Sequence, residues 1–177
     1  MVTATRGYVS LAAMYKPSLF AAAAIGALAI APGAAAAKSA SSPIARAASI
    51  AERYWGAVPC GGKIKILVAQ RSPRVLGQDA DAWVTFSSSL GANNLAAPAS
   101  TYTNCTVALG QWRWPTVATM IPDWDMLCMT MTHEFGHLLG HVHVTTPGNV
   151  MNPVFTNYND EPKLCQTDRP AGAGARP

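Results

Sequence analysis

The sequence has few charged residues and contains no run of like charge. Asp, Glu, Lys and Arg make up 12% of the 177 residues, and the formal net charge is +4. No cluster of Lys and Arg alternates with aromatic residues, so the chain lacks the basic surface that nucleic-acid-binding proteins use. Nucleic acid is therefore not an expected partner.

Two metal or redox motifs are also missing. No C-x-x-C pair occurs, which argues against a cysteine-ligated zinc site and a thioredoxin-like motif. No acidic cluster has the spacing of a calcium loop, so calcium is not expected. The four cysteines are Cys60, Cys105, Cys128 and Cys165. An even number in a small exported chain favours disulfides, but four cysteines allow three pairings and spacing alone does not choose.

The longest apolar run lies near the start of the chain. Residues 19–30 carry no charge, two basic residues precede them, and small residues follow up to Ala37. This pattern predicts a signal peptide over residues 1–37, cleaved near Ala36 or Ala37, and hence a secreted, extracellular protein. A retained membrane anchor is the alternative, because residues 19–37 are barely long enough to span a bilayer. No second run of that length occurs, and we expect no stable membrane association after cleavage.

The remaining residues 38–177 are enough for one domain with a single core. We expect a linker at 38–42 and a disordered tail at 171–177, where small residues dominate. A helix is predicted over 43–55, with Ser42 as its N-cap, and strands over 63–69, 82–87 and 101–109. Helices and strands in this order predict an α+β fold, and we expect a monomer.

The strongest helical pattern runs from Asp123 to Leu139. Asp123 can cap the exposed amides at its start, and Gly140 is a suitable end because glycine reverses the backbone at little cost. Apolar residues recur along one face at i, i+4, i+7 and i+8: Met131, Phe135, Leu138 and Leu139. His133 and His137 fall on roughly the opposite side.

All four histidines of the chain lie within residues 133–143, in the pattern H-E-x-x-H-x-x-G-x-x-H. His133 and His137 are one helical turn apart, so both imidazoles can reach one metal ion. Gly140 breaks the helix and lets His143 approach from another direction. Three protein ligands leave a fourth position for water, as in a catalytic zinc site. We therefore predict one Zn²⁺ held by His133, His137 and His143.

Glu134 lies beside the first ligand and can act as the general base. It would take a proton from the zinc-activated water and pass it to the leaving amine of a cleaved peptide bond. His141 is a rival third ligand on a continued helix. Because Gly140 argues against that continuation, His141 is expected near the cleft but not on the metal.

The histidine motif resembles that of the metzincin zinc metalloproteases, and the chain looks most like the matrixin branch and its small bacterial relatives. The segment Asn149–Pro153 is similar to the Met-turn of that family, which assigns Met151 to the apolar base beneath the metal. The resemblance implies a twisted mixed β-sheet with an active-site helix and a short C-terminal subdomain. It also implies an endopeptidase whose extended peptide or protein substrate adds to a sheet edge.

Further expectations follow from this resemblance. Thr103–Leu109 is expected to be the substrate-binding edge strand, and Tyr158 could border the pocket for the residue after the cut bond. The segment around Cys60 is weakly similar to a matrixin cysteine switch, but its position before the first strand suits a disulfide better. We therefore expect Cys60–Cys105, and Cys128–Cys165 tying the short tail to the active-site helix.

Two alternatives to this function remain. Glu161 could be the third ligand, as in proteases with a downstream glutamate, although Gly140 and His143 would then be unexplained. The protein could also be a zinc-stabilised extracellular binding module without turnover. Glu134 argues against the second alternative, because a purely structural site needs no base beside its water.

Overall fold

The computed structural model describes residues 42–73, 76, 80–155 and 161–174, which all belong to one compact unit, 39–177. The expected signal peptide lies outside the described residues. Among the described residues, no helix has the length and apolar character needed to cross a membrane. The predicted helix at 43–55 is confirmed as α1 (Pro43–Trp55). Ser42 accepts a hydrogen bond from the Ala45 amide at its start, and Gly56 ends it in a left-handed conformation.

The described strands form one mixed sheet in the order β1-β4-β2-β3. β1 (Ile64–Ala69), β2 (Ala82–Ser88) and β4 (Thr103–Gly110) match the three predicted strands to within two residues at each end. β3 (Gly91–Ala92) is a short strand between the second and third predicted strands. β4 pairs with β1 in parallel and with β2 antiparallel. The expected α+β fold with a mixed sheet is confirmed.

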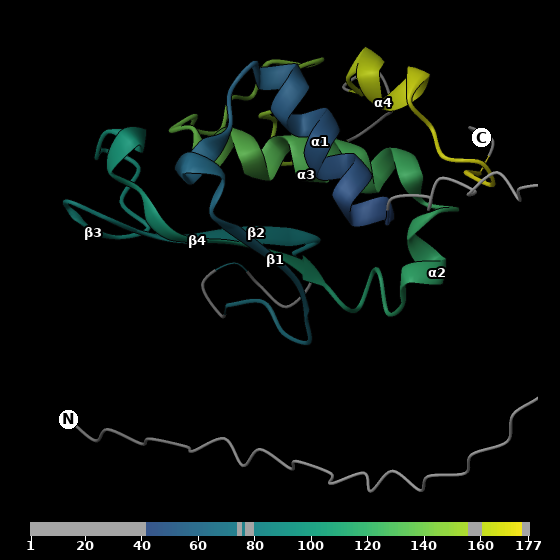
Figure 1. Ribbon diagram of the computed structural model, residues 1–177, viewed down its shortest axis with the longest axis horizontal. Helices are drawn as coiled ribbons and strands as arrows, with labels where there is room; N and C mark the ends of the chain where they lie inside the picture. The colour runs from purple at the N-terminus through teal and green to yellow at the C-terminus, as the bar shows by residue number, and fades with distance from the viewer. Residues whose placement is uncertain (1–41, 74–75, 77–79, 156–160, 175–177) are drawn as a thin grey trace, which may run out of the picture. The chain divides into compact units, whose positions relative to one another are not determined.

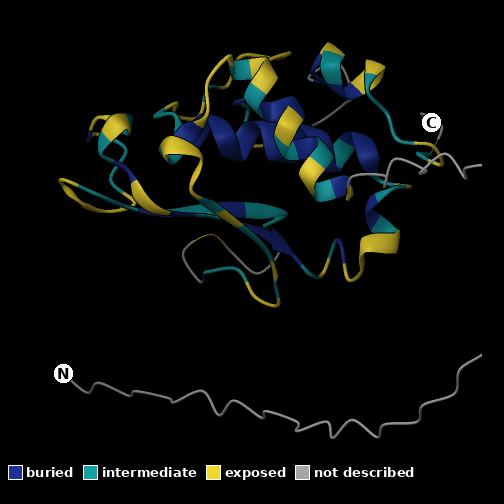
Figure 2. Cartoon of the chain, viewed as in Figure 1, coloured by how far each residue is buried: buried dark blue, intermediate teal, exposed yellow. Residues whose placement is uncertain are grey.

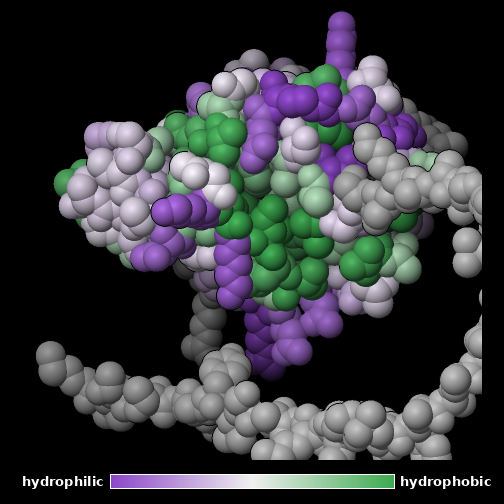
Figure 3. Space-filling model, in the orientation of Figure 1, coloured by the Kyte–Doolittle hydropathy of each residue, from purple (hydrophilic) through white to green (hydrophobic). Residues whose placement is uncertain are grey.

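The expected role of Thr103–Leu109 as an edge strand is wrong. These residues form most of β4, which lies between β1 and β2 and is hydrogen-bonded on both sides. Its C-terminal half is fully buried, as a central strand requires. Among the described strands, β1 occupies one edge. Its apolar residues are only half covered, and Figure 3 shows apolar side chains gathering over this part of the molecule.

Helices α1 and α3 (Trp124–Leu138) cover one face of the sheet (Figure 1). The core lies between them and the sheet, and α3 is its most buried element (Figure 2). Shorter helical segments among the described residues connect these elements, including a 3-10 turn at Pro59–Gly62, another at Ala99–Thr101, and α2 (Val117–Met120). α4 (Lys163–Thr167) packs near α1 and α3.

The C-terminal residues correct one expectation. Residues 171–174 belong to the domain, because Ala173 packs against the core and the Arg169 side chain donates a hydrogen bond to the Gly174 carbonyl at 2.7 Å. Arg169 also pairs with Asp125 at the start of α3. Small residues therefore do not make this stretch disordered, since an arginine side chain holds its backbone. Residues 175–177 lie outside the described residues.

Candidate metal centre

Helix α3 carries the first two histidines, and it is supported in a way that the sequence did not reveal. Asp123 precedes it, but its side chain makes no capping hydrogen bond, contrary to expectation. The carboxylate instead accepts hydrogen bonds from Arg113 Nε at 2.8 Å and Trp114 Nε1 at 2.9 Å. A charged guanidinium is a stronger partner for a half-buried carboxylate than a backbone amide, which explains why Asp123 binds Arg113 and does not cap α3.

Two disulfides hold the domain, with the pairing that the resemblance implied. Cys60 is bonded to Cys105, which joins the turn before β1 to β4. Cys128 is bonded to Cys165, which joins the buried side of α3 to α4. The second bond connects the segment after Met151 to the helix that carries His133 and His137.

The three predicted histidines converge on one point. The Nε2 atoms are 3.1 Å apart for His133 and His137, 3.2 Å for His133 and His143, and 3.0 Å for His137 and His143. Gly140 adopts φ +88° directly after α3, and this bend brings His143 back toward the helix. His133 and His137 are buried, whereas His143 is exposed. Among the described residues, these three form the cluster that could hold a metal ion.

Backbone carbonyls orient two of the rings. His133 Nδ1 lies 2.7 Å from the Val150 carbonyl, and His137 Nδ1 lies 2.8 Å from the His141 carbonyl. A carbonyl only accepts, so each Nδ1 carries the proton and each Nε2 presents a lone pair. Lone pairs facing one another at 3.1 Å repel unless a cation lies among them. Two nitrogens bound tetrahedrally to one zinc ion at about 2.0–2.1 Å would be about 3.3 Å apart, which fits this arrangement.

Burial keeps these imidazoles neutral. It lowers the pKa of His133 to about 4, even though the Val150 carbonyl acts in the opposite direction. Burial also lowers the pKa of His137 and of His143. Neutral imidazole is the form that binds metal ions, so the site is ready for a metal at neutral pH.

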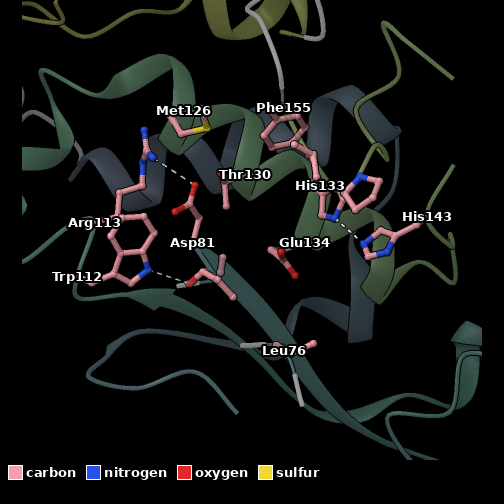
Figure 4. Close-up of a pocket in the computed structure, with 14 residues that line it drawn as sticks. Leu76, Asp81, Trp112, Arg113, Met126, Thr130, His133, Glu134, His143 and Phe155 are labelled. Atoms are coloured by element: carbon pink, nitrogen blue, oxygen red, sulfur yellow. Dashed lines mark hydrogen bonds and ion pairs between the residues drawn. The ribbon is translucent and has the colours of Figure 1, made fainter. Parts of the chain in front are cut away.

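Glu134 lies on the cleft side of α3, next to this cluster (Figure 4). It borders two cavities, of about 670 Å³ and 510 Å³, and His143 borders both as well. Burial raises the pKa of the Glu134 carboxyl to about 8 in the metal-free protein. A carboxyl group that holds a proton near neutral pH is suited to general acid–base work.

Met151 lies beneath the histidine-bearing helix. It is 3% exposed, and its backbone amide donates to Asn149 Oδ1 at 2.8 Å, which shapes the turn. A Cβ at Gly136 would overlap the Met151 sulfur and lie 2.8 Å from Trp55 Cζ2. Gly136, between the two histidines of the helix, therefore allows Met151 and α1 to approach closely.

Sequence reasoning missed the part that Trp55 plays. Its indole Nε1 donates to the Thr132 carbonyl at 2.8 Å, and its ring stacks on His141 with centroids 4.3 Å apart. His141 is exposed and lies outside the histidine cluster, as expected, and its carbonyl orients His137. No spacing in the sequence connects Trp55 with a motif about 80 residues later, so only the packing of α1 on α3 reveals it.

One other candidate residue lies outside the histidine cluster. Glu161, the alternative third ligand, is buried but is not part of the histidine cluster. Its backbone carbonyl accepts a hydrogen bond from the Gln166 side chain of α4. Tyr158 lies outside the described residues.

The fold and the histidine cluster define an α+β domain of the metzincin type. The matrixin family (Peptidase M10) matches residues 67–172, which is more than half of the chain, and the chain belongs to this family of metallopeptidases. The resemblance drawn from the sequence is thereby confirmed. Comparisons with curated proteins and with solved structures give no match.

Proposed function

We propose that this protein is a secreted zinc-dependent endopeptidase. The observation that carries the proposal is the convergence of three neutral imidazole nitrogens within 3.2 Å of one another, beside a buried carboxyl group in an open cleft. His133, His137 and His143 would hold the zinc ion. When bound, zinc supplies a Lewis acid that activates water and polarises the scissile carbonyl.

The protein's own residues would move the protons and orient the ligands. The Glu134 carboxylate takes the proton of the attacking water and returns it to the leaving amine nitrogen. The carbonyls of Val150 and His141 keep His133 and His137 in the tautomer that presents Nε2. Met151 packs against Gly136, which keeps the turn that contains Met151 in close contact with α3.

The substrate strand is proposed to pair with β2, in place of the strand expected from the sequence. Ala82, Trp83 and Val84 of β2 border the cavity that also contains His137 and His143. Within the described residues, β3 pairs with β2 only at Ser87 and Ser88. An extended peptide could therefore add along the first half of β2 and cross the metal site.

Export is part of the proposal. Two disulfides with no free cysteine fit an oxidising compartment, and we propose that residues 1–37 are removed as a signal peptide. Mass spectrometry of the protein from the medium of an expressing host should show a chain that begins near Lys38. A full-length protein that stays with the membrane fraction would support a retained anchor instead.

The activity is tested by combining metal analysis with proteolysis. The purified protein should contain one zinc per chain and cleave unfolded casein, and a chelator should abolish the cleavage. Glu134→Gln should reduce the rate by at least about a hundredfold, since general acid–base catalysis contributes that much, while zinc remains bound.

Glu52→Gln is the matched control, because Glu52 lies on α1 and borders none of the described cavities. It should leave both the zinc content and the rate unchanged. If zinc-loaded wild-type protein cleaves no substrate, the protein is a zinc-stabilised binding module and the enzyme proposal fails.

A further inference from the structure

The larger cavity beside Glu134 has an apolar wall and a polar end. It lies on the side where Phe155 packs edge-on against His133, with ring centroids 5.7 Å apart. The apolar residues that border it are Leu76, Ala80, Ala82, Trp112, Met126, Pro153, Val154 and Phe155. Asp81, Arg113 and Thr130 line its other end, and Figure 4 shows them across the cavity from Leu76.

Arg113 pairs with two carboxylates at the polar end of the cavity, those of Asp123 and Asp81. Arg113 donates to Asp123 through Nε at 2.8 Å and through Nη2 at 3.2 Å. Its ion pair with Asp81 is longer, with Nη1 and Oδ2 3.4 Å apart. Burial raises the pKa of Asp81, Arg113 lowers it, and the charge of Asp123 raises it. The negative charge of Asp81 is therefore less well neutralised by Arg113 than that of Asp123. Asp81 is also the one of these two carboxylates that borders the cavity.

Thr130 adds a buried hydroxyl group that has no hydrogen-bond partner among the described residues. Its side chain is 3% exposed, and Oγ1 makes no hydrogen bond to any described residue. Thr132, two residues later on the same helix, donates to the Cys128 carbonyl at 2.8 Å. A buried hydroxyl without a partner costs free energy, so a ligand group that reaches it is favoured.

The smaller cavity on the other side of Glu134 differs in character. Apart from Glu134 and the histidines, it is bordered by apolar residues and one amide: Leu76, Ala82, Trp83, Val84, Phe86, Asn93, Leu95 and Val142. No other charged side chain borders it within the described part of the chain. The two sides of the cleft therefore differ in the charged groups that line them.

We propose that the larger cavity binds a basic side chain, that of lysine or arginine, next to the bond that is cleaved. The proposal rests on the proposed peptidase function. The aliphatic stem packs against Met126 and Phe155. The cation pairs with Asp81, and Thr130 Oγ1 accepts one of its hydrogen bonds. Asp81 and Thr130 are specificity-determining residues, whereas Glu134 and the histidines carry the reaction.

The test uses zinc-loaded protein and peptides that differ at one position flanking the cut bond. Lysine is compared with norleucine, which has the same unbranched stem without the charge, and with glutamate. The lysine peptide should have a kcat/KM about fivefold above that of the norleucine peptide, as a partly solvated ion pair allows. The glutamate peptide should be the poorest substrate.

Variants assign this preference to the cavity. Asp81→Asn should bring the lysine-to-norleucine ratio close to one, and Thr130→Val should lower it by about half. Asp168→Asn is the matched control: it removes the same charge at the end of α4, where Asp168 pairs with Arg53, and should leave the ratio unchanged. Thermal unfolding of each variant shows whether the fold is intact.

Binding separates this inference from the peptidase proposal. Calorimetry on the zinc-loaded Glu134→Gln variant should show tighter binding of the lysine peptide than of the norleucine peptide, even if the wild-type protein cleaves neither. A wild-type preference for norleucine, or a lysine preference that survives Asp81→Asn, overturns the inference while leaving the peptidase proposal standing. Equal binding of both peptides to the inactive variant also overturns it.

Discussion

Helices α1 and α3 lie side by side, but they depend on the rest of the chain to different degrees. α1 has a serine N-cap, a proline in its first turn and a glycine after its end, and it buries only four of its 13 residues. α3 has no side-chain cap and buries 14 of its 15 residues. The first helix is specified by its own sequence, whereas the second is held by its neighbours. Glu134 and two of the three proposed zinc ligands, His133 and His137, lie on the second.

The largest expected effect on stability comes from removing the Cys128–Cys165 disulfide, which joins α3 to α4. Replacing Cys128 and Cys165 together by serine should lower the free energy of unfolding by about 2–5 kcal/mol, as removal of a disulfide from a small domain typically does. Urea unfolding of the zinc-loaded protein measures the change. Zinc affinity should fall as well, because the bond holds the helix that carries two ligands.

The other disulfide is the control for this experiment. Cys60 and Cys105 are separated by 45 residues, against 37 for the first pair, so both bonds should restrict the unfolded chain similarly. Replacing Cys60 and Cys105 should lower stability by a comparable amount with little effect on zinc affinity. An equal loss of zinc affinity in both double variants would show that the Cys128–Cys165 bond supports zinc binding no more than the Cys60–Cys105 bond does.

Two glycines, one within α3 and one directly after α1, should respond differently to replacement by alanine. Gly136→Ala should destabilise the protein by about 1–3 kcal/mol, because the new methyl group overlaps Met151 and crowds Trp55. Gly56→Ala should cost about 1 kcal/mol, because a Cβ there meets nothing but the backbone has φ +61°. Only Gly136→Ala should also weaken zinc binding, measured by competition with a chelator. Unchanged zinc affinity in Gly136→Ala would contradict the support assigned to Met151.

The smallest expected effect is a pH dependence of the metal-free protein. The folded-state pKa of Glu134, about 8, lies above its ordinary value of 4.5, so the folded protein holds a proton that the unfolded chain releases. This contribution to stability is complete below pH 4.5 and is lost as pH rises through 8. Between pH 6.5 and 8, this group alone should lower stability by about 1 kcal/mol per pH unit, while the lowered pKa values of His133, His137 and His143 act in the opposite direction near pH 6.5.

Glu134→Gln isolates this effect, because it removes the titrating group and retains the shape of the side chain. Urea unfolding of the two metal-free proteins should show the variant gaining about 1 kcal/mol per pH unit relative to the wild-type protein from pH 6.5 to 8. Below pH 6.5, both proteins should lose stability as pH falls toward 4, because burial lowers the folded-state pKa of His133, His137 and His143 and the unfolded chain takes up these protons first. Identical slopes above pH 6.5 would place the Glu134 carboxyl in water.

The histidine cluster could be predicted because it depends on short-range geometry. Residues four apart on a helix share a face, and a glycine after the helix permits the left-handed bend that returns His143 to His137. The same locality made α1 predictable to the residue. The position of β4 could not be predicted in this way, because strand order is a property of pairing between distant segments.

The sequence by itself determined the ligand spacing, the bend at Gly140 and the limits of α1, because each follows from the backbone geometry of a few consecutive residues. Only the tertiary structure decided which strand borders the cleft, that Arg113 takes the carboxylate of Asp123, and that Asp81 and Thr130 meet at one end of a cavity. These contacts join residues that are many positions apart, and packing selects them from many pairings that local geometry permits equally.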